Sequence, residues 1–367
     1  MEQIEQGPLR VALVFGGVSP EHEISILSAS KVVAGLADLR MRRPLRVQAI
    51  YINRDGQWLW LDPESAAIPE EAHLAAAENW EQAPAHYPFR ALNFPQSLER
   101  LRQWPAGVVM PIMHGPGGED GRLQAALDLA ELPYTGSGCA ASALALDKPR
   151  AQAVLNAAGL PVPLSTAVRA GTRMEGRERV LAVVGLPCVV KPASGGSSVG
   201  ITLVRCAQDL AGALHTAFQV DEDVMVERFV EGRELTCGVV ERHGEPRPCA
   251  VTEIIPPEGR FFDYDAKYQV GVSRELTPAR IEPALASRIQ TLALAAHRCL
   301  GCRGFSRVDF IAGEHGPVIL EVNTIPGMTA TSLLPQGAAE IGIGFSGLLE
   351  LMLDAARYDG AARPGDG

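Results

Sequence analysis

The chain has 367 residues, of which 47% are hydrophobic and 21% charged, and its formal net charge is −10. This balance is typical of a globular protein with two or three domains, and it argues against a nucleic-acid partner, whose phosphates attract clustered Lys and Arg. The chain begins with neither a basic region nor a long apolar run, so no signal peptide is expected there. No apolar stretch approaches the roughly 20 residues of a membrane helix. We therefore expect a cytoplasmic protein with no membrane partner.

The first third of the chain alternates apolar strands with helices. Residues 11–15 predict a short buried strand, and Ser19 suits the cap of a following helix, which puts Glu21 in the first helical turn. Further strands are predicted at 46–53 and 107–113. Strand, turn and helix in this order predict a parallel, doubly wound sheet.

Two polar residues follow strands of this first part. Glu21 and His114 would both lie at the carboxyl edge of the sheet, where open α/β sheets bind ligands. Taken singly, each could instead be a helix cap or a satisfied polar residue. Residues 64–105 show no clear pattern and are interpreted as a surface excursion, and the first domain is predicted to end in the loop at 133–138.

Beyond residue 186 the sequence is rich in strands. Helices are predicted at 207–218, 283–300 and 345–356, and the whole pattern indicates antiparallel sheets in an α+β second half. The predicted strands are 186–192, 200–204, 224–230, 234–242 and 249–255.

The seven cysteines are scattered, and an odd number without regular spacing favours a reducing compartment over a disulfide framework. Cys299 and Cys302 form a CxxC pair with no second pair nearby to complete a zinc site. We expect buried, unreactive thiols there.

A glycine-rich loop follows the strand that contains Lys191. Residues 194–200 read SGGSSVG, and glycines let backbone N–H groups approach phosphate oxygens while the lysine adds positive charge. The loop is not a Walker A motif, because a strand follows it, and Gly16-Gly17 lacks the GxGxxG spacing of a dinucleotide site. A plain hairpin turn explains the loop alone equally well.

Two more segments carry candidate binding groups. Glu227 and Glu234 flank a turn between predicted strands, where carboxylates could hold ribose hydroxyls and an adenine edge, or could simply be solvated. Residues 261–268, FFDYDAKY, could form a lid that excludes water, or a packed surface loop.

The segment 307–327 predicts a hairpin with a polar face. Alternation puts Arg307 and Asp309 on one face of the first strand, and Glu321 and Asn323 on one face of the second. A turn at 313–316 then sets Asp309 opposite Glu321 and Arg307 opposite Asn323. Carboxylate and amide oxygens gathered in this way suit Mg²⁺ beside substrate phosphates. The alternative is a solvated salt-bridge ladder.

Together these motifs resemble the D-alanine:D-alanine ligase family of the ATP-grasp superfamily. The similarity runs in family order from about residue 10 to 355, and its most specific elements are HGPGGEDG at 114–121 and EVNTIPG at 321–327. The other matching stretches are GGVSPEHEIS at 16–25, LPYTGSG at 132–138, ALDKPRAQ at 145–152, VVKPASGGSSVGIT at 189–202, MVERFVEGRELT at 225–236, FFDYDAKY at 261–268 and GCRGFSRVDF at 301–310.

The resemblance implies an ATP-grasp fold of mixed α/β and α+β class. An N-terminal doubly wound parallel-sheet domain would precede two antiparallel-sheet domains that clasp ATP. The implied divisions are residues 1–136 for substrate binding, 137–227 for the central ATP-grasp subdomain and 228–367 for the C-terminal ATP-grasp and catalytic domain. The family also suggests a homodimer.

The resemblance further implies how ATP would be held. Lys148 and Lys191 would neutralise its phosphates, and the loop containing Ser198 would close over them. Family members often carry Lys where this chain has Arg228. The residues implied to surround the adenosine part are Glu227, Arg228, Phe229, Val230 and Glu234, with Glu234 on the ribose.

The reaction implied by the family joins two D-alanine molecules through a D-alanyl phosphate, for peptidoglycan precursor synthesis. Asp309, Glu321 and Asn323 would hold two Mg²⁺ (or Mn²⁺) ions between the phosphates. Arg307 and the backbone N–H of Gly327 would stabilise the oxyanion that forms with the peptide bond.

The substrate contacts are likewise implied by the family. Glu21 would fix the ammonium group of the first D-alanine, and Ser332 and Leu333 would meet the carboxylate of the second. The residues implied to complete the closed pocket are Ser197 and Tyr268, hydrogen-bonded to Glu21, with Lys267 and His114 beside them.

Relatives that make D-alanyl-D-lactate lack a loop like the one that bears Tyr268, so the resemblance implies an amine as the second nucleophile. The alternative enzyme is a D-alanine:D-lactate ligase or another ATP-grasp carboxylate-amine ligase. A catalytically silent nucleotide-binding protein would lack ligands that this chain retains.

Overall fold

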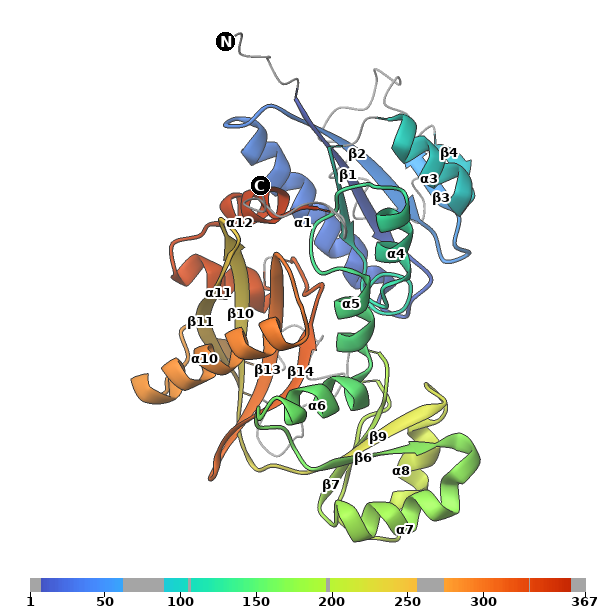
Figure 1. Ribbon diagram of the computed structural model, residues 1–367, viewed down its shortest axis with the longest axis vertical. Coiled ribbons are helices and arrows are strands. Elements are labelled where there is room, and N and C mark those ends of the chain that lie inside the picture. Colours follow the sequence, from blue (N-terminus) through green and yellow to red (C-terminus); the bar gives the residue numbers. More distant parts are fainter. Residues whose placement is uncertain are drawn as a thin grey trace.

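The computed structural model describes residues 8–61, 89–104, 107–195, 199–255, 274–329 and 331–357. They form three sheets along the long axis of the molecule, with the N-terminal sheet at one end and a small four-stranded sheet at the other (Figure 1). The strands of the N-terminal sheet, in spatial order, are β4 (Phe89–Leu92), β3 (Trp58–Leu61), β2 (Leu45–Ile52), β1 (Leu9–Gly16) and β5 (Val108–Ile112).

The N-terminal sheet is mixed. β1 pairs in parallel with β2 and β5, as predicted, whereas β3 and β4 add to the edge in antiparallel fashion. The short Asp55-Gly56 turn between β2 and β3 explains the difference, because strands joined by so few residues can only run antiparallel. Helix α1 (His22–Arg40) packs on this sheet and also against α12 (Phe345–Asp354) near the C-terminus.

The start of α1 differs from the prediction. Its N-cap residue is Glu21, and the hydroxyl of Ser19 instead accepts a hydrogen bond from the Glu21 N–H (3.1 Å) within the turn before the helix. The extra turn leaves Glu21 at the N-terminal end of α1, directly before its first residue and facing the edge of the sheet.

The interpretation of 64–105 as a plain excursion is wrong for its described part. β4 adds to the sheet there, and α3 (Phe94–Gln103) follows it. Asn93 and Gln96 form a capping box at the start of α3, with the side chain of each accepting from the backbone N–H of the other. The sequence Asn-Phe-Pro-Gln carries this signal, so the helix was predictable.

The C-terminal sheet is antiparallel throughout. Helix α10 (Pro283–Cys299) covers one face, where Ile289 and Ala293 pack with Leu235 and Phe310. The opposite face carries polar side chains, and α11 (Leu333–Glu340) packs over one end of it. The strands, in spatial order, are β12 (Arg274–Leu276), β11 (Glu245–Ile255), β10 (Gly232–Arg242), β13 (Phe305–Gly313) and β14 (Gly316–Asn323).

The small sheet is also antiparallel. Helices α7 (Arg173–Val183) and α8 (Leu210–Ala217) pack against its strands. Its strands, in spatial order, are β6 (Ser165–Arg169), β9 (Asp223–Arg228), β7 (Cys188–Pro192) and β8 (Thr202–Val204).

A pair of helices connects the N-terminal and small sheets. α4 (Arg122–Leu129) is followed by α5 (Cys139–Leu146) and α6 (Lys148–Ala157), which run down the middle of the molecule (Figure 1). Both α5 and α6 contact β14, so they bring the start of α6 against the polar hairpin.

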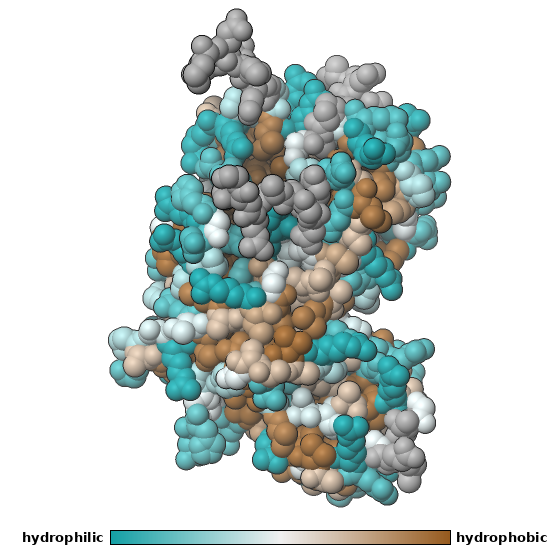
Figure 2. Space-filling model, in the orientation of Figure 1, coloured by the Kyte–Doolittle hydropathy of each residue, from teal (hydrophilic) through white to brown (hydrophobic). Residues whose placement is uncertain are grey.

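The surface and the thiols agree with the composition. On the face shown in Figure 2, hydrophilic residues cover most of the periphery, and apolar residues gather across the middle, near α10. No helix among the described residues is long and apolar enough to cross a membrane. All seven cysteines are free thiols. Cys302 is buried as expected, and burial raises its pKa to about 12, which keeps it unreactive, whereas Cys299 is only partly buried.

Candidate active site

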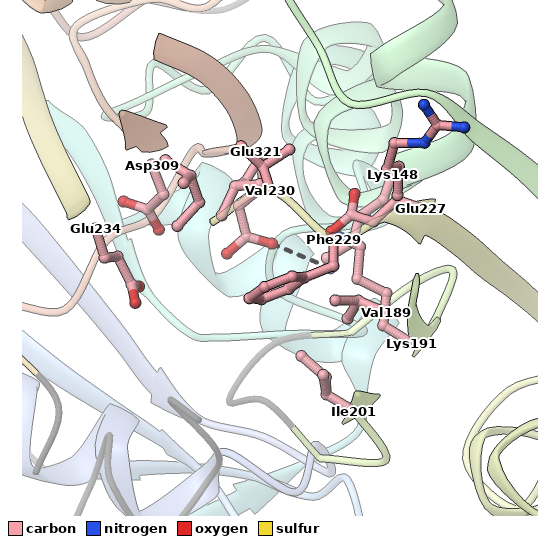
Figure 3. A pocket seen from close by; sticks show the side chains of 13 residues that line it. Lys148, Val189, Lys191, Ile201, Glu227, Phe229, Val230, Glu234, Asp309 and Glu321 are labelled. Atoms are coloured by element: carbon pink, nitrogen blue, oxygen red, sulfur yellow. Dashed lines mark hydrogen bonds and ion pairs between the residues drawn. The ribbon is translucent and has the colours of Figure 1, made fainter. Parts of the chain in front are cut away.

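A cavity of about 130 Å³ lies between the small sheet and the C-terminal sheet (Figure 3). Val189, Ile201, Ile311 and Leu320 give it apolar walls suited to a flat ring. The predicted site residues that line it are Lys148, Lys191, Glu227, Arg228, Phe229, Val230, Glu234, Asp309 and Glu321.

Lys191 and Glu227 form a buried ion pair at one side of the cavity. The Lys191 Nζ lies 2.8 Å from Glu227 Oε1, and the two residues sit on neighbouring strands β7 and β9. The other carboxylate oxygen accepts a hydrogen bond from Gln152 Nε2 (3.0 Å), and Gln152 Oε1 accepts one from Ser165 (3.0 Å). Glu227 is therefore a fixed carboxylate with a defined orientation toward the cavity.

Sequence analysis missed Gln152. It is buried in α6, one turn after Lys148, and its amide also reaches the Leu320 carbonyl on β14 (3.3 Å). This side chain thus connects the small sheet to the C-terminal sheet. Its place in the ALDKPRAQ motif was the available signal.

Lys148 connects the hairpin to the glycine-rich loop. It is the first residue of α6, after the cap residue Asp147, which accepts a hydrogen bond from the Arg150 N–H. Its Nζ lies 3.4 Å from Glu321 Oε2 and donates to the carbonyl of Gly195. A positive charge is therefore held where the loop and the hairpin meet.

The hairpin has the predicted pairing, with Asp309 opposite Glu321 and Arg307 opposite Asn323. A bulge between the turn and these pairs leaves Leu320 without a strand partner. Because of that extra residue, Glu321 rather than Leu320 faces Asp309.

Arg307 and Asp309 are buried and bound to each other. The guanidinium Nε and Nη2 donate to the two Asp309 oxygens at 2.8 and 2.7 Å, and Thr236 donates to Oδ1 at 2.6 Å. The alternative of a solvated salt-bridge ladder does not apply to this pair, because the side chains of Arg307 and Asp309 are only 9% and 11% exposed.

The donor set fits a hard divalent cation. Asp309, Glu321 and Asn323 supply two carboxylates and an amide on one face of two paired strands. That composition agrees with Mg²⁺, which takes few protein ligands and completes its shell with phosphate and water oxygens.

The side chains of first-domain residues bind backbone groups of the loop that follows β14. His114 Nδ1 donates to the Ile325 carbonyl (2.9 Å), and Ser28 accepts from the N–H of Met328 (3.2 Å). Burial, more than the charge of Arg307, lowers the pKa of His114, while Glu21 and the Ile325 carbonyl oppose the shift. The imidazole is therefore neutral at physiological pH.

Glu119 is a second buried residue that sequence analysis missed. Its carboxylate accepts hydrogen bonds from the N–H groups of Gly115 (2.7 Å) and Ile325 (3.2 Å). Burial and the neighbouring Glu21 carboxylate raise its pKa to about 8. The same turn holds Glu21 close, since a Cβ at Gly115 would lie 2.9 Å from Glu21 Oε2.

Gly327 and Ser332 lie side by side. A Cβ at Gly327 would lie 2.8 Å from the Ser332 hydroxyl, which also accepts from the Thr329 N–H (2.9 Å). Ser332 is the N-cap residue of α11 and Leu333 is its first residue, so the backbone N–H groups at the start of a helix lie at this position. Such a terminus suits a substrate carboxylate.

Arg228 lines the cavity, but its guanidinium group is hydrogen-bonded to the backbone of Val184. Its Nε and Nη2 both donate to the Val184 carbonyl, at 3.0 and 2.9 Å. Phe229 is fixed by its N–H, which donates to Pro187 (3.1 Å). The predicted residues Ser197, Ser198, Lys267 and Tyr268 lie outside the described residues.

Two antiparallel sheets that face each other across a cavity, one with a buried lysine and the other with paired carboxylates, define an ATP-grasp protein. The comparisons with known proteins agree. Residues 10–137 match the family model for the N-terminus of D-Ala-D-Ala ligase, and residues 154–354 match the model for its C-terminus.

Curated relatives extend over almost the whole chain. A D-alanine–D-alanine ligase of Leptospira interrogans is 38% identical, covering 95% of this chain and 99% of that protein. One from Mycolicibacterium smegmatis is 39% identical, with 95% and 96% covered. The chain therefore belongs to the D-alanine–D-alanine ligase family.

Solved structures show the same fold. The D-alanine–D-alanine ligase of Coxiella burnetii superposes with a TM-score of 0.78 at 27% identity, over 95% of this chain and 94% of that one. The VanG D-Ala:D-Ser ligase of Enterococcus faecalis gives a TM-score of 0.79 at 32% identity, over 95% and 99%. The name of the VanG enzyme gives D-serine in place of the second D-alanine, on the same fold.

Proposed function

We propose that the protein joins two D-alanine molecules to D-alanyl-D-alanine with the consumption of ATP, through a D-alanyl phosphate. The observation that carries the proposal is the meeting of Lys148, Glu321 and the Arg307–Asp309 pair at one cavity, in a chain of this family. Such a site can hold a phosphate donor and, beside it, an oxyanion stabiliser.

The nucleotide would occupy the cavity between the sheets. Its flat ring would lie among the apolar walls, with the fixed Glu227 carboxylate at its edge and Glu234 on the ribose. Lys148 and Lys191 would exchange their carboxylate partners for phosphate oxygens. Ser198, Arg228, Phe229 and Val230 complete the proposed nucleotide contacts.

Two Mg²⁺ or Mn²⁺ ions would be held by Asp309, Glu321 and Asn323. When bound, they would neutralise phosphate charge and so lower the repulsion between ATP and an attacking carboxylate. Metal use and ATP use are general to the family, while the identity and number of ions are part of this proposal.

In the first step, the carboxylate of one D-alanine attacks the γ-phosphate, and ADP leaves. Lys148 would screen the approaching charges, and Glu21 would hold the substrate's ammonium group beside the neutral His114. His114 also keeps the loop after β14 in place through the Ile325 carbonyl.

In the second step, the amine of the other D-alanine attacks the acyl phosphate carbonyl, and phosphate leaves. Arg307 and the N–H of Gly327 would stabilise the oxyanion, and Ser332 with Leu333 would bind the incoming carboxylate. Ser197, Tyr268 and Lys267 would close the pocket over both substrates.

The test is to incubate the protein with ATP, Mg²⁺ and D-alanine and to identify the product by mass. Dipeptide and phosphate released in equal amounts are expected. Binding of ATP without release of phosphate would overturn the proposal. D-Serine and D-lactate, offered separately as second substrates, measure how strictly D-alanine is preferred.

Three features remain part of the proposal. We retain the domain division at 136 and 227, the cytoplasmic location and the homodimer as predictions from the sequence and its family resemblance. Size-exclusion chromatography with light scattering would test the dimer directly.

A further inference from the structure

One carboxylate on the polar face of the C-terminal sheet has no part in the site described so far. Glu275 lies on the edge strand β12 and pairs with Ile254, which in turn pairs with Glu234 on β10. Residues paired directly across antiparallel strands share a face, so Glu275 is on the same face as Glu234 and Asp309. It therefore looks toward the substrate side of the sheet and away from α10.

Glu275 is tied to the loop that would bind the second substrate. Gln336 Nε2 donates to Glu275 Oε2 (2.7 Å) and also to the carbonyl of Thr331 (2.8 Å), the residue before Ser332. Gln336 Oε1 accepts from Thr277 (3.1 Å). A single amide nitrogen thus joins the carboxylate to the start of α11, and the amide itself is fixed on both sides.

Glu275 forms no ion pair with a described residue, although the charge of Arg307 acts on it from a distance. It is half-buried, and the only side-chain hydrogen bond to it in that part of the chain comes from the neutral Gln336. Burial raises its pKa, and the hydrogen bond from Gln336 and the charge of Arg307 oppose the shift only in part. Arg307 is itself engaged by Asp309. A half-buried carboxylate in this position would be stabilised by a bound cation.

We propose that Glu275 binds the α-ammonium group of the second amino acid as it enters, before a proton is lost to solvent and the free amine attacks, and so selects an amino acid over a hydroxy acid, whose hydroxyl carries no charge. The inference rests on the proposed function and adds a specificity residue to it. The carboxylate of that substrate would lie at the start of α11, and its ammonium group would face Glu275, next to the reacting carbonyl at Arg307.

A purely structural role makes a different prediction. If Glu275 only anchored Gln336, a neutral glutamine would serve as well, because its carbonyl oxygen accepts the same hydrogen bond. If its charge is what matters, then aspartate would be the better replacement, even though its side chain is shorter.

The experiment compares Glu275→Gln and Glu275→Asp by steady-state kinetics, with the Michaelis constants for the first and second D-alanine resolved. For Glu275→Gln we expect the constant for the second D-alanine to rise about tenfold, as for a lost charge-assisted hydrogen bond, with those for ATP and the first D-alanine unchanged. Glu275→Asp should restore most of the affinity.

An unchanged constant for the second D-alanine in Glu275→Gln would overturn the inference. So would a larger loss in Glu275→Asp than in Glu275→Gln. Thermal melting of both variants checks that they fold. Dipeptide synthesis by the wild-type protein tests the proposed function separately, so a failure of the inference can be told apart from a failure of the proposed function.

Discussion

The β13–β14 hairpin and the glycine-rich turn at 114–121 both place carboxylates at the same site, but they stabilise them differently. On the hairpin, Asp309 is bound by Arg307 and Glu321 by Lys148, side chains of opposite charge. In the turn, Glu119 is held by two backbone N–H groups, and burial beside Glu21 raises its pKa to about 8. The hairpin is thus arranged for binding charge, and the turn for joining two parts of the fold.

The largest expected effect tests the hairpin side of this comparison. Glu321→Gln keeps the shape of the side chain but removes the charge proposed to bind metal, so turnover should fall by at least about 100-fold. Thermal melting should show a folded protein with almost unchanged stability. Turnover near the wild-type value would contradict the proposed role of Glu321 as a metal ligand.

Arg307→Lys should separate the two chemical steps. Lysine cannot make the two parallel bonds that Arg307 makes, and loss of an oxyanion donor typically costs about 100-fold or more in rate. We expect phosphate release to exceed dipeptide formation, because the acyl phosphate would be hydrolysed while it waits. Arg303→Lys is the matched control, since the side chain of that buried arginine donates to the carbonyls of Gly136 and Arg357. Equal amounts of phosphate and dipeptide in Arg307→Lys would contradict the assigned role.

Glu119→Gln tests the other side, through pH. The pKa of Glu119 is raised from 4.5 to about 8, so the folded state keeps a proton that the unfolded state releases. Its contribution to stability is present below pH 4.5 and is lost as the pH rises toward 8, by about 1.4 kcal/mol for each pKa unit as an upper limit. Relative to the wild type, the variant should therefore lose less stability between pH 5 and pH 8. Parallel urea-unfolding profiles would show that Glu119 does not titrate in this way.

Gln152→Leu should have a moderate effect that is confined to the binding of ATP. It leaves Glu227 Oε2 without its amide donor, and an unsatisfied buried polar group costs about 1–3 kcal/mol. We expect the Michaelis constant for ATP to rise about fivefold or more, with less change in the constants for D-alanine. An unchanged constant for ATP would mean that Glu227 keeps its orientation unaided.

The smallest effect is expected far from both regions. Arg43, in the turn after α1, and Asp354, the last residue of α12, form an ion pair (2.6 Å) with side chains 34% and 54% exposed. Such exposed pairs contribute about 0–1 kcal/mol, so Arg43→Ala should leave turnover intact and barely change melting. A large loss of stability would show that the contact of α1 with α12 depends on charge as well as on packing.

Local patterns in the sequence determined much of this protein. Alternation identified which face of the hairpin carries Arg307 and Asp309, because strand neighbours point to opposite sides whatever lies beyond. The parallel strands β1, β2 and β5 and the long helix α10 were equally legible. The capping box of Asn93 and Gln96 was present in the sequence but was not used.

Contacts between distant segments decided the rest. The turn pairs Gly313 with Gly316, and an unbroken ladder from it would set Asp309 opposite Leu320. The bulge that brings Glu321 into place lies where Ile319 donates to Pro161 and the Leu320 carbonyl accepts from Gln152, so packing against α6 accompanies it.

The residues missed by sequence analysis share this dependence on tertiary structure. Glu119 meets Ile325 across 206 positions, Gln152 meets Glu227 across 75, and Gln336 meets Glu275 across 61. No window of sequence contains both partners, so only the folded chain shows which polar groups are buried together. The sequence by itself therefore determined the elements and the family, whereas the tertiary structure decided which carboxylates have cations, which have backbone N–H groups and which has neither.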